Sequence, residues 1–161
     1  MQDRPKSRNL ARARCACGVV RIEMQSPAMW AWHDHTRASR HAHGAAAAVW
    51  VGTWKSRMRI VEGQDALSVW TDPKTGATRS FCSACGTPML YERAHSPKAV
   101  NIPRAAFETG VGREPRYHVG FEERPPWAYR EEAVKPLKGF PGVVWTGAGK
   151  RRSRPEDEDL F

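Results

Sequence analysis

The sequence has no long apolar run, since nothing in its 161 residues approaches the roughly 20 consecutive apolar residues that span a bilayer. Its first residues, Met1 to Arg14, are basic and polar, and no apolar segment follows them as it would in an export signal. We therefore expect a cytoplasmic protein that does not enter membranes. Cysteine is also scarce, and in a reducing compartment the four present are better explained as metal ligands or reactive thiols than as disulfides.

Acidic residues are fewer than basic ones, 17 against 26, which gives a net charge of +9. Such a balance favours polyanionic partners, because lysine and arginine displace counterions from phosphate. Much of the basic excess, however, lies near the two ends of the chain, where segments are usually solvated. It is contributed by Arg4, Lys6, Arg8, Arg12, Arg14, Lys150, Arg151, Arg152 and Arg154. The sequence thus predicts weak, non-specific nucleic-acid binding rather than a dedicated binding face.

Long stretches with helical periodicity are missing, and no internal repeat is present. Short apolar and β-branched runs alternate instead with turn-forming residues, which predicts an all-β fold of short antiparallel strands. The expected strands cover residues 19–24, 49–54, 58–61, 67–70, 78–81, 88–91, 99–102 and 116–122. Residues 30–48 favour a loop that passes into a short helix, with Asp34 or Thr36 as its N-cap.

One domain is expected over residues 14–142, between a basic tail at 1–13 and a charged tail at 143–161. Seven tryptophans are many for this length, and aromatic residues at strand spacing usually fill the space between sheets. We therefore assign Trp50 and Trp70 to the core. Trp30 and Trp32 are expected to line a pocket.

The four cysteines form two pairs, Cys15-Ala16-Cys17-Gly18 and Cys82-Ser83-Ala84-Cys85-Gly86. Two such pairs suit a tetrahedral zinc ion, because neighbouring thiolates on a tight turn can both reach one metal at about 2.3 Å. The glycine after each pair lets the backbone turn and frees amides to donate to the sulfurs. The alternatives are four buried thiols or a redox CxxC, but a redox motif normally lies beside a βαβ pattern, which is absent here. We predict one structural zinc with no open coordination position.

These cysteine segments resemble those of the glutathione-dependent formaldehyde-activating enzyme family, which shares its domain with centromere protein V. The matching features are residues 15–21, residues 79–88, Pro115 and Pro126-Trp127. The resemblance implies a β-tent fold in which the first and last cysteine pairs hold a structural zinc. It also implies carbon–sulfur lyase chemistry on glutathione, with a middle motif, CHCxxCRxxxG, that holds a second, catalytic zinc.

The corresponding segment here runs from Asp34 to Gly44, and it departs from that motif. His35, Arg40 and Gly44 match, whereas the three cysteine positions hold Asp34, Thr36 and Ser39. Hydroxyl groups are poor zinc ligands compared with thiolates, so the second site is not expected to form. His35 as a general base and Arg40 as a carboxylate-binding group are the candidate catalytic residues. Ser39→Ala is expected to change stability little.

The segment is also rich in histidine, and imidazoles with a carboxylate could rebuild a metal site of another kind. The residues concerned are His33, Asp34, His35, His41 and His43. The simpler interpretation is that they are exposed polar residues on a loop and helix start. Two functions follow from these patterns. One is a zinc-stabilised carbon–sulfur lyase that acts on glutathione or a related thiol adduct, and the other is a non-catalytic module that binds nucleic acid or protein.

Overall fold

The computed structural model describes residues 10–128 and 135–145. These residues form two β-sheets and one α-helix, α1, which confirms the expected all-β fold with a short middle helix. A small sheet has the order β1-β2-β5, and a larger one has the order β11-β12-β10-β3-β4-β9-β8-β7-β6. The strands are β1 (Leu10–Arg14), β2 (Arg21–Gln25), β3 (Trp30–Asp34), β4 (Ala48–Trp54), β5 (Met58–Glu62), β6 (Leu67–Thr71), β7 (Thr78–Cys82), β8 (Pro88–Glu92), β9 (Ala99–Pro103), β10 (Tyr117–Val119), β11 (Lys135–Pro136) and β12 (Val143–Trp145). Four short 3-10 helices, η1 (Lys55–Arg57), η2 (Gln64–Ala66), η3 (Arg104–Ala106) and η4 (Phe121–Glu123), lie in the connections.

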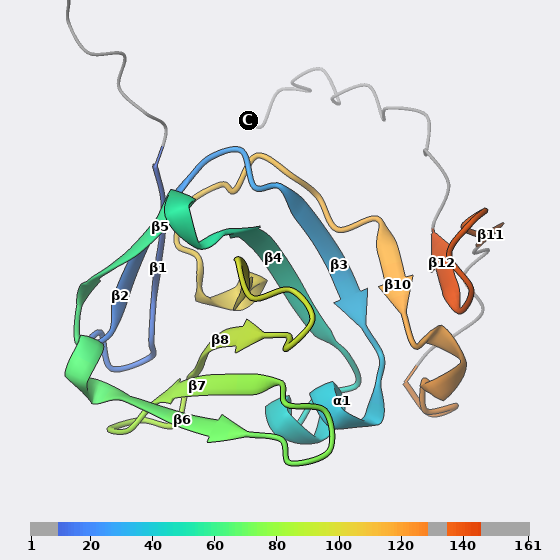
Figure 1. Ribbon diagram of the computed structural model, residues 1–161, viewed down its shortest axis with the longest axis horizontal. Helices are drawn as coiled ribbons and strands as arrows, with labels where there is room; N and C mark the ends of the chain where they lie inside the picture. The colour runs from blue at the N-terminus through green and yellow to red at the C-terminus, as the bar shows by residue number, and fades with distance from the viewer. Residues whose placement is uncertain (1–9, 129–134, 146–161) are drawn as a thin grey trace, which may run out of the picture.

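The strands surround an interior in three groups (Figure 1). The small sheet forms one wall, β3 and β4 form the opposite one, and β6, β7 and β8 run across the base. The main core is made by side chains that the small sheet and the middle of the large sheet turn towards each other, such as Ile22, Met24, Met89 and Ile102. A second, smaller cluster is built around Trp32 and Trp50.

Helix α1 (Arg37–His43) joins the end of β3 to the start of β4. Its N-cap is Thr36, whose hydroxyl accepts a hydrogen bond from the Ser39 amide, so the expected choice between Asp34 and Thr36 resolves to Thr36. The helix ends at Gly44, which adopts the left-handed conformation with φ of 57°. These two caps fix the segment that carries the altered motif.

The structure differs from the expected boundaries at both ends of the domain. Strand β1 begins at Leu10, inside the segment expected to be a tail, because Ala11 and Ala13 alternate with exposed residues and bury against the small sheet. Strand β12 extends to Trp145 and pairs with β10, although residues from 143 onward were expected to be a tail. The remainder of the two expected tails, residues 1–9 and 146–161, lies outside the described residues.

Three further expectations were wrong. Residues 30–34 were expected in a loop but form β3, which is held between β4 and a parallel partner, β10. The expected strand at 116–122 is cut to three residues, since Gly120 takes a left-handed conformation before η4. Trp70 is 51% exposed because β6 is an edge strand, whereas Trp50 is buried as expected. None of the described helices has the length and apolar character that crossing a membrane requires.

Candidate metal centre and adjoining pocket

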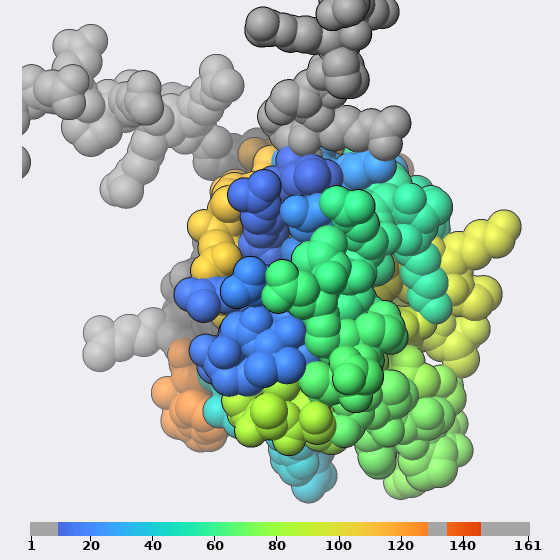
Figure 2. Space-filling view, turned by 90° about the vertical axis from the view of Figure 1, so that its left-hand side faces the viewer, coloured from blue at the N-terminus to red at the C-terminus, as the bar shows by residue number. Residues whose placement is uncertain are grey.

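The four cysteines lie together where the turn after β1 meets the end of β7 and the turn that follows it. Their sulfur atoms are all within 4.8 Å of one another, with Cys15 and Cys82 buried and Cys17 and Cys85 exposed. Figure 2 shows this face of the molecule, with the blue turn after β1 resting on the yellow-green turn that precedes β8. A backbone amide links the two turns, since Ala16 donates to the Thr87 hydroxyl at 3.1 Å.

Each cysteine pair sits on a tight turn that its glycine makes possible. Gly18 and Gly86 have φ values of 80° and 73°, and each donates its amide to the carbonyl of the first cysteine of its pair. After the first turn, the Val20 amide donates to Cys15 Sγ at 3.2 Å. This is the amide-to-sulfur bond that the sequence predicts, and it stabilises a thiolate at that position.

The geometry of the sulfurs fits a metal ion of the zinc type. A tetrahedral ion with bonds of about 2.3 Å to sulfur sets its ligands about 3.8 Å apart. The distances from Cys17 Sγ to Cys15 Sγ and to Cys82 Sγ are 3.4 and 3.8 Å. Hydrogen bonding by Thr87 lowers the pKa of Cys85 to about 5, whereas the neighbouring thiols raise the pKa of Cys17 to about 12. The distances between the sulfurs, and not these opposed shifts, are the evidence for a metal site. The four cysteines can therefore hold one metal ion in a closed shell.

The polar side chains that replace the motif cysteines are hydrogen-bonded to one another. Asp34 accepts at Oδ1 from the Thr36 amide and hydroxyl, at 3.0 and 2.7 Å. At Oδ2 it accepts from the Ser39 hydroxyl at 2.7 Å and from Trp50 Nε1 at 3.2 Å. Arg79 Nη2 in turn donates to Ser39 Oγ at 3.1 Å. Both carboxylate oxygens of the buried Asp34 are thus already occupied by donors. We call these five residues the Asp34 network.

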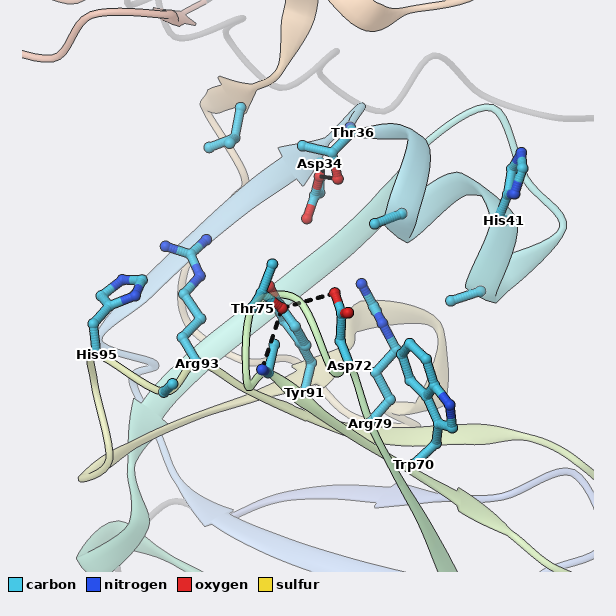
Figure 3. Close-up of a pocket in the computed structure, with 15 residues that line it drawn as sticks. Asp34, Thr36, His41, Trp70, Asp72, Thr75, Arg79, Tyr91, Arg93 and His95 are labelled. Atoms are coloured by element: carbon cyan, nitrogen blue, oxygen red, sulfur yellow. Dashed lines mark hydrogen bonds between the residues drawn. The ribbon is translucent and has the colours of Figure 1, made fainter.

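A pocket of about 820 Å³ opens beside the Asp34 network. Figure 3 shows Asp34 and Arg93 extending into the same space from β3 and from the end of β8. Charged, aromatic and hydroxyl side chains line most of it, namely Asp34, Thr36, His41, Trp70, Asp72, Thr75, Arg79, Tyr91, Arg93 and His95. The second aspartate, Asp72, is occupied by the Lys74 amide and the Thr75 hydroxyl. The acidic groups of the pocket are therefore satisfied locally.

The two arginines of the pocket, Arg79 and Arg93, do not use all of their guanidinium hydrogen-bond donors within the part of the chain that the structure describes. Arg79 Nη1 is buried and has no hydrogen-bond partner there, and its guanidinium lies 4.4 Å from the centre of the Tyr91 ring. Burial lowers the pKa of Arg79, as expected for a cation removed from water. The Arg93 guanidinium lies over aromatic faces, at 5.1 Å from the centre of the Trp32 ring and 6.0 Å from that of Tyr91. The pocket can accept an anion.

The candidate catalytic residues from the motif lie elsewhere. His35 is fully buried, with Nε2 2.9 Å from His118 Nδ1 and its ring against Phe121. Burial, followed by the charge of His118, lowers its pKa to about 4. Arg40 donates to the carbonyls of His35 and Glu123. Neither residue lines the pocket, so their catalytic roles stay predictions.

The motif histidines do not form one group. His33 and His35 stack with ring centres 6.4 Å apart, while His41 and His43 lie elsewhere, and the buried His35 differs from the exposed position expected for it. His33 stacks on His118 with ring centres 4.6 Å apart, His43 packs edge-on against Trp50, and the exposed His41 lines the pocket. Among residues 10–128 and 135–145, the four cysteines are the one group of three or more metal-ligating side chains close enough to share an ion. Arg79 and Arg93 were missed as site residues. Arg79 lies in the segment next to the second cysteine pair, but nothing in the sequence around Arg93 marks it.

Comparison with known proteins agrees with this architecture. The sequence profile of the family described as glutathione-dependent formaldehyde-activating enzyme matches residues 10–123. No curated protein matches the chain significantly. The crystal structure of a Rhodobacter sphaeroides protein, 23% identical, has a TM-score of 0.53 and covers 65% of this chain and 97% of its own, which supports the fold alone. Since the profile spans most of the chain, this protein belongs to the glutathione-dependent formaldehyde-activating enzyme family.

Proposed function

We propose that this chain is a carbon–sulfur lyase that takes glutathione, or a related small thiol adduct, in the pocket beside the Asp34 network. One zinc ion on Cys15, Cys17, Cys82 and Cys85 would hold the fold together. The observation that carries the proposal is the placement of two incompletely paired arginines on the wall of a pocket of about 820 Å³. A compound such as glutathione carries carboxylates and, after cleavage, a thiolate, and guanidinium groups are suited to bind such anions.

We do not propose a second zinc ion for this chain, because the side chains at the position of the family's second zinc are poor zinc ligands. The three positions hold a carboxylate and two hydroxyls in place of thiolates. To bind a metal, Asp34 would have to give up hydrogen bonds from Thr36, Ser39 or Trp50. The arrangement supports a metal-independent site in which Arg79 supplies the positive charge.

The reaction needs a general base that accepts a proton and a cationic group that stabilises the negative charge formed on sulfur. In the lyase direction, the hydroxyl of an S-hydroxymethyl thiol adduct loses its proton to a base. The carbon–oxygen double bond then forms as the carbon–sulfur bond breaks, and the electron pair stays on sulfur as a thiolate. In this proposal Arg79 would stabilise that thiolate, and the exposed imidazole of His41, which also lines the pocket, is the candidate base.

Two measurements test the proposal. Calorimetry should detect glutathione binding that weakens at least about tenfold in Arg93→Gln, because one charge-assisted contact is lost. A matched control is Arg59→Gln, an exposed arginine on β5 that pairs with Glu23 and lies outside the pocket. Exchange NMR should show faster interconversion of glutathione, formaldehyde and their adduct than in buffer. Absence of glutathione binding to the unmodified protein would overturn the proposal.

A second candidate is a thiol-binding protein without catalysis. The observation that favours it is the Asp34 network itself, since hydrogen-bonded oxygens replace thiolates at the position of the family's catalytic metal. The NMR measurement separates the two candidates. Binding together with faster exchange supports the lyase, and binding with exchange at the buffer rate supports the non-catalytic protein.

A further inference from the structure

A second cavity, of about 580 Å³, adjoins the pocket and has a different character. Aromatic and aliphatic side chains from β3, β4, β10 and the segment around β12 line it. We call it the aromatic groove, and its lining includes Trp30, Trp32, Trp54, Tyr117, Phe140 and Val143. Three of these large side chains remain substantially exposed, with Trp54 at 42%, Tyr117 at 40% and Phe140 at 61%. An exposed cluster of this kind usually marks a binding surface.

The floor of the groove is held in place. Trp30 Nε1 donates to Asn101 Oδ1 at 2.8 Å, and the Trp54 ring meets Trp30 edge-on at 5.1 Å. Gly52 allows this arrangement, since a Cβ there would lie 1.5 Å from Trp30 Nε1. Asn101 also donates to the Tyr91 carbonyl, which ties the groove to the strand that lines the pocket. The aromatic surface is therefore preorganised.

The groove and the pocket meet at two residues. Arg93 and Val119 line both cavities. The Arg93 guanidinium lies over the Trp32 ring of the groove and near the Tyr91 ring of the pocket. An anion held by Arg93 would thus be positioned at the border between a charged cavity and an apolar one.

We propose that the aromatic groove receives an apolar substituent carried on the sulfur of the thiol compound bound in the pocket. The inference rests on the proposed function and narrows its substrate class to anionic thiol adducts with a hydrophobic group. Glutathione itself is polar along its whole length, so it would leave the groove unfilled. Continuity of the two cavities through Arg93, together with the change from charged to aromatic lining, supports this occupant.

Calorimetry with S-methylglutathione and S-hexylglutathione tests the inference. Because each buried methylene strengthens binding severalfold, the hexyl compound should bind at least about tenfold more tightly to the unmodified protein. Trp54→Ala should reduce this ratio to about twofold or less, while the affinity for the methyl compound stays the same. A matched control is Trp127→Ala, an exposed tryptophan at 77% that lines neither cavity, and it should keep the full ratio.

Other outcomes overturn the inference in distinguishable ways. Equal affinity for the two compounds would show that the groove takes no substituent, while leaving the proposed function intact. Failure of both compounds to bind would remove the proposed function and this inference together. A concentration-dependent dimer in sedimentation, lost in Trp54→Ala, would assign the groove to a second copy of the chain and overturn the inference.

Discussion

The hydroxyl of Ser39 donates a hydrogen bond of 2.7 Å to Asp34, and through this contact two positions of the altered motif satisfy each other. Arg79 Nη2 donates to the same hydroxyl at 3.1 Å. A serine buried to 1% exposure is thereby both donor and acceptor between a carboxylate and a guanidinium. The segment that would otherwise surround a metal is held by hydrogen bonds.

Ser39→Ala should therefore destabilise the domain, although the sequence alone favours little effect. The change leaves the Asp34 carboxylate without one donor and Arg79 Nη2 without its acceptor, in a buried place. We expect the free energy of unfolding to fall by about 1–3 kcal/mol, measured by urea denaturation. The control is Ser56→Ala, an exposed serine in η1. Equal stability of the two variants would show that the Asp34 network contributes nothing.

Restoring the cysteines should create the second metal site. The triple variant Asp34→Cys, Thr36→Cys, Ser39→Cys places three thiols at the ends of β3 and the start of α1, where the oxygens now converge. We expect zinc content to rise from one to two ions per chain, measured by elemental mass spectrometry on the folded protein. The corresponding triple alanine variant is the control, and its zinc content should stay at one ion per chain. An unchanged single ion in the cysteine variant would count against our account of the motif.

Cys82→Ser should release the structural metal and unfold the domain. Cys82 is fully buried among the four sulfurs, and the binding free energy of a structural zinc is also folding free energy. Circular dichroism and metal analysis would follow the loss, with exposed Ser83→Ala as the neighbouring control. A Cys82→Ser protein that stays folded with its metal would contradict the four-thiolate site.

His35 should stay neutral far below the usual range of histidine. Burial first, and then the charges of His118 and His33, lower its pKa to about 4, against about 6.5 when unfolded. Between these values the unfolded chain binds more protons, so stability should fall as pH falls, by about 1.4 kcal/mol per pH unit from this group. NMR titration of the ring should give a midpoint near 4 in the folded protein. A midpoint unchanged from that of the urea-unfolded chain would refute the prediction.

The cysteine pairs and the strand pattern were readable from the sequence because they depend on local spacing. The glycine after each pair and the alternation of apolar residues needed no knowledge of the fold. Strand β3 escaped prediction because its His and Asp side chains mask a strand whose backbone is paired on both sides. The burial of Ser39, His35 and Arg79 depends on contacts between distant segments, and no local pattern reports such contacts.

The measurement that tests the account most directly is the metal content of freshly purified protein, per chain, by elemental mass spectrometry without added chelator. The account predicts one zinc ion, bound by Cys15, Cys17, Cys82 and Cys85. Two ions per chain would contradict it, because a second metal would have to displace the hydrogen bonds that now occupy Asp34.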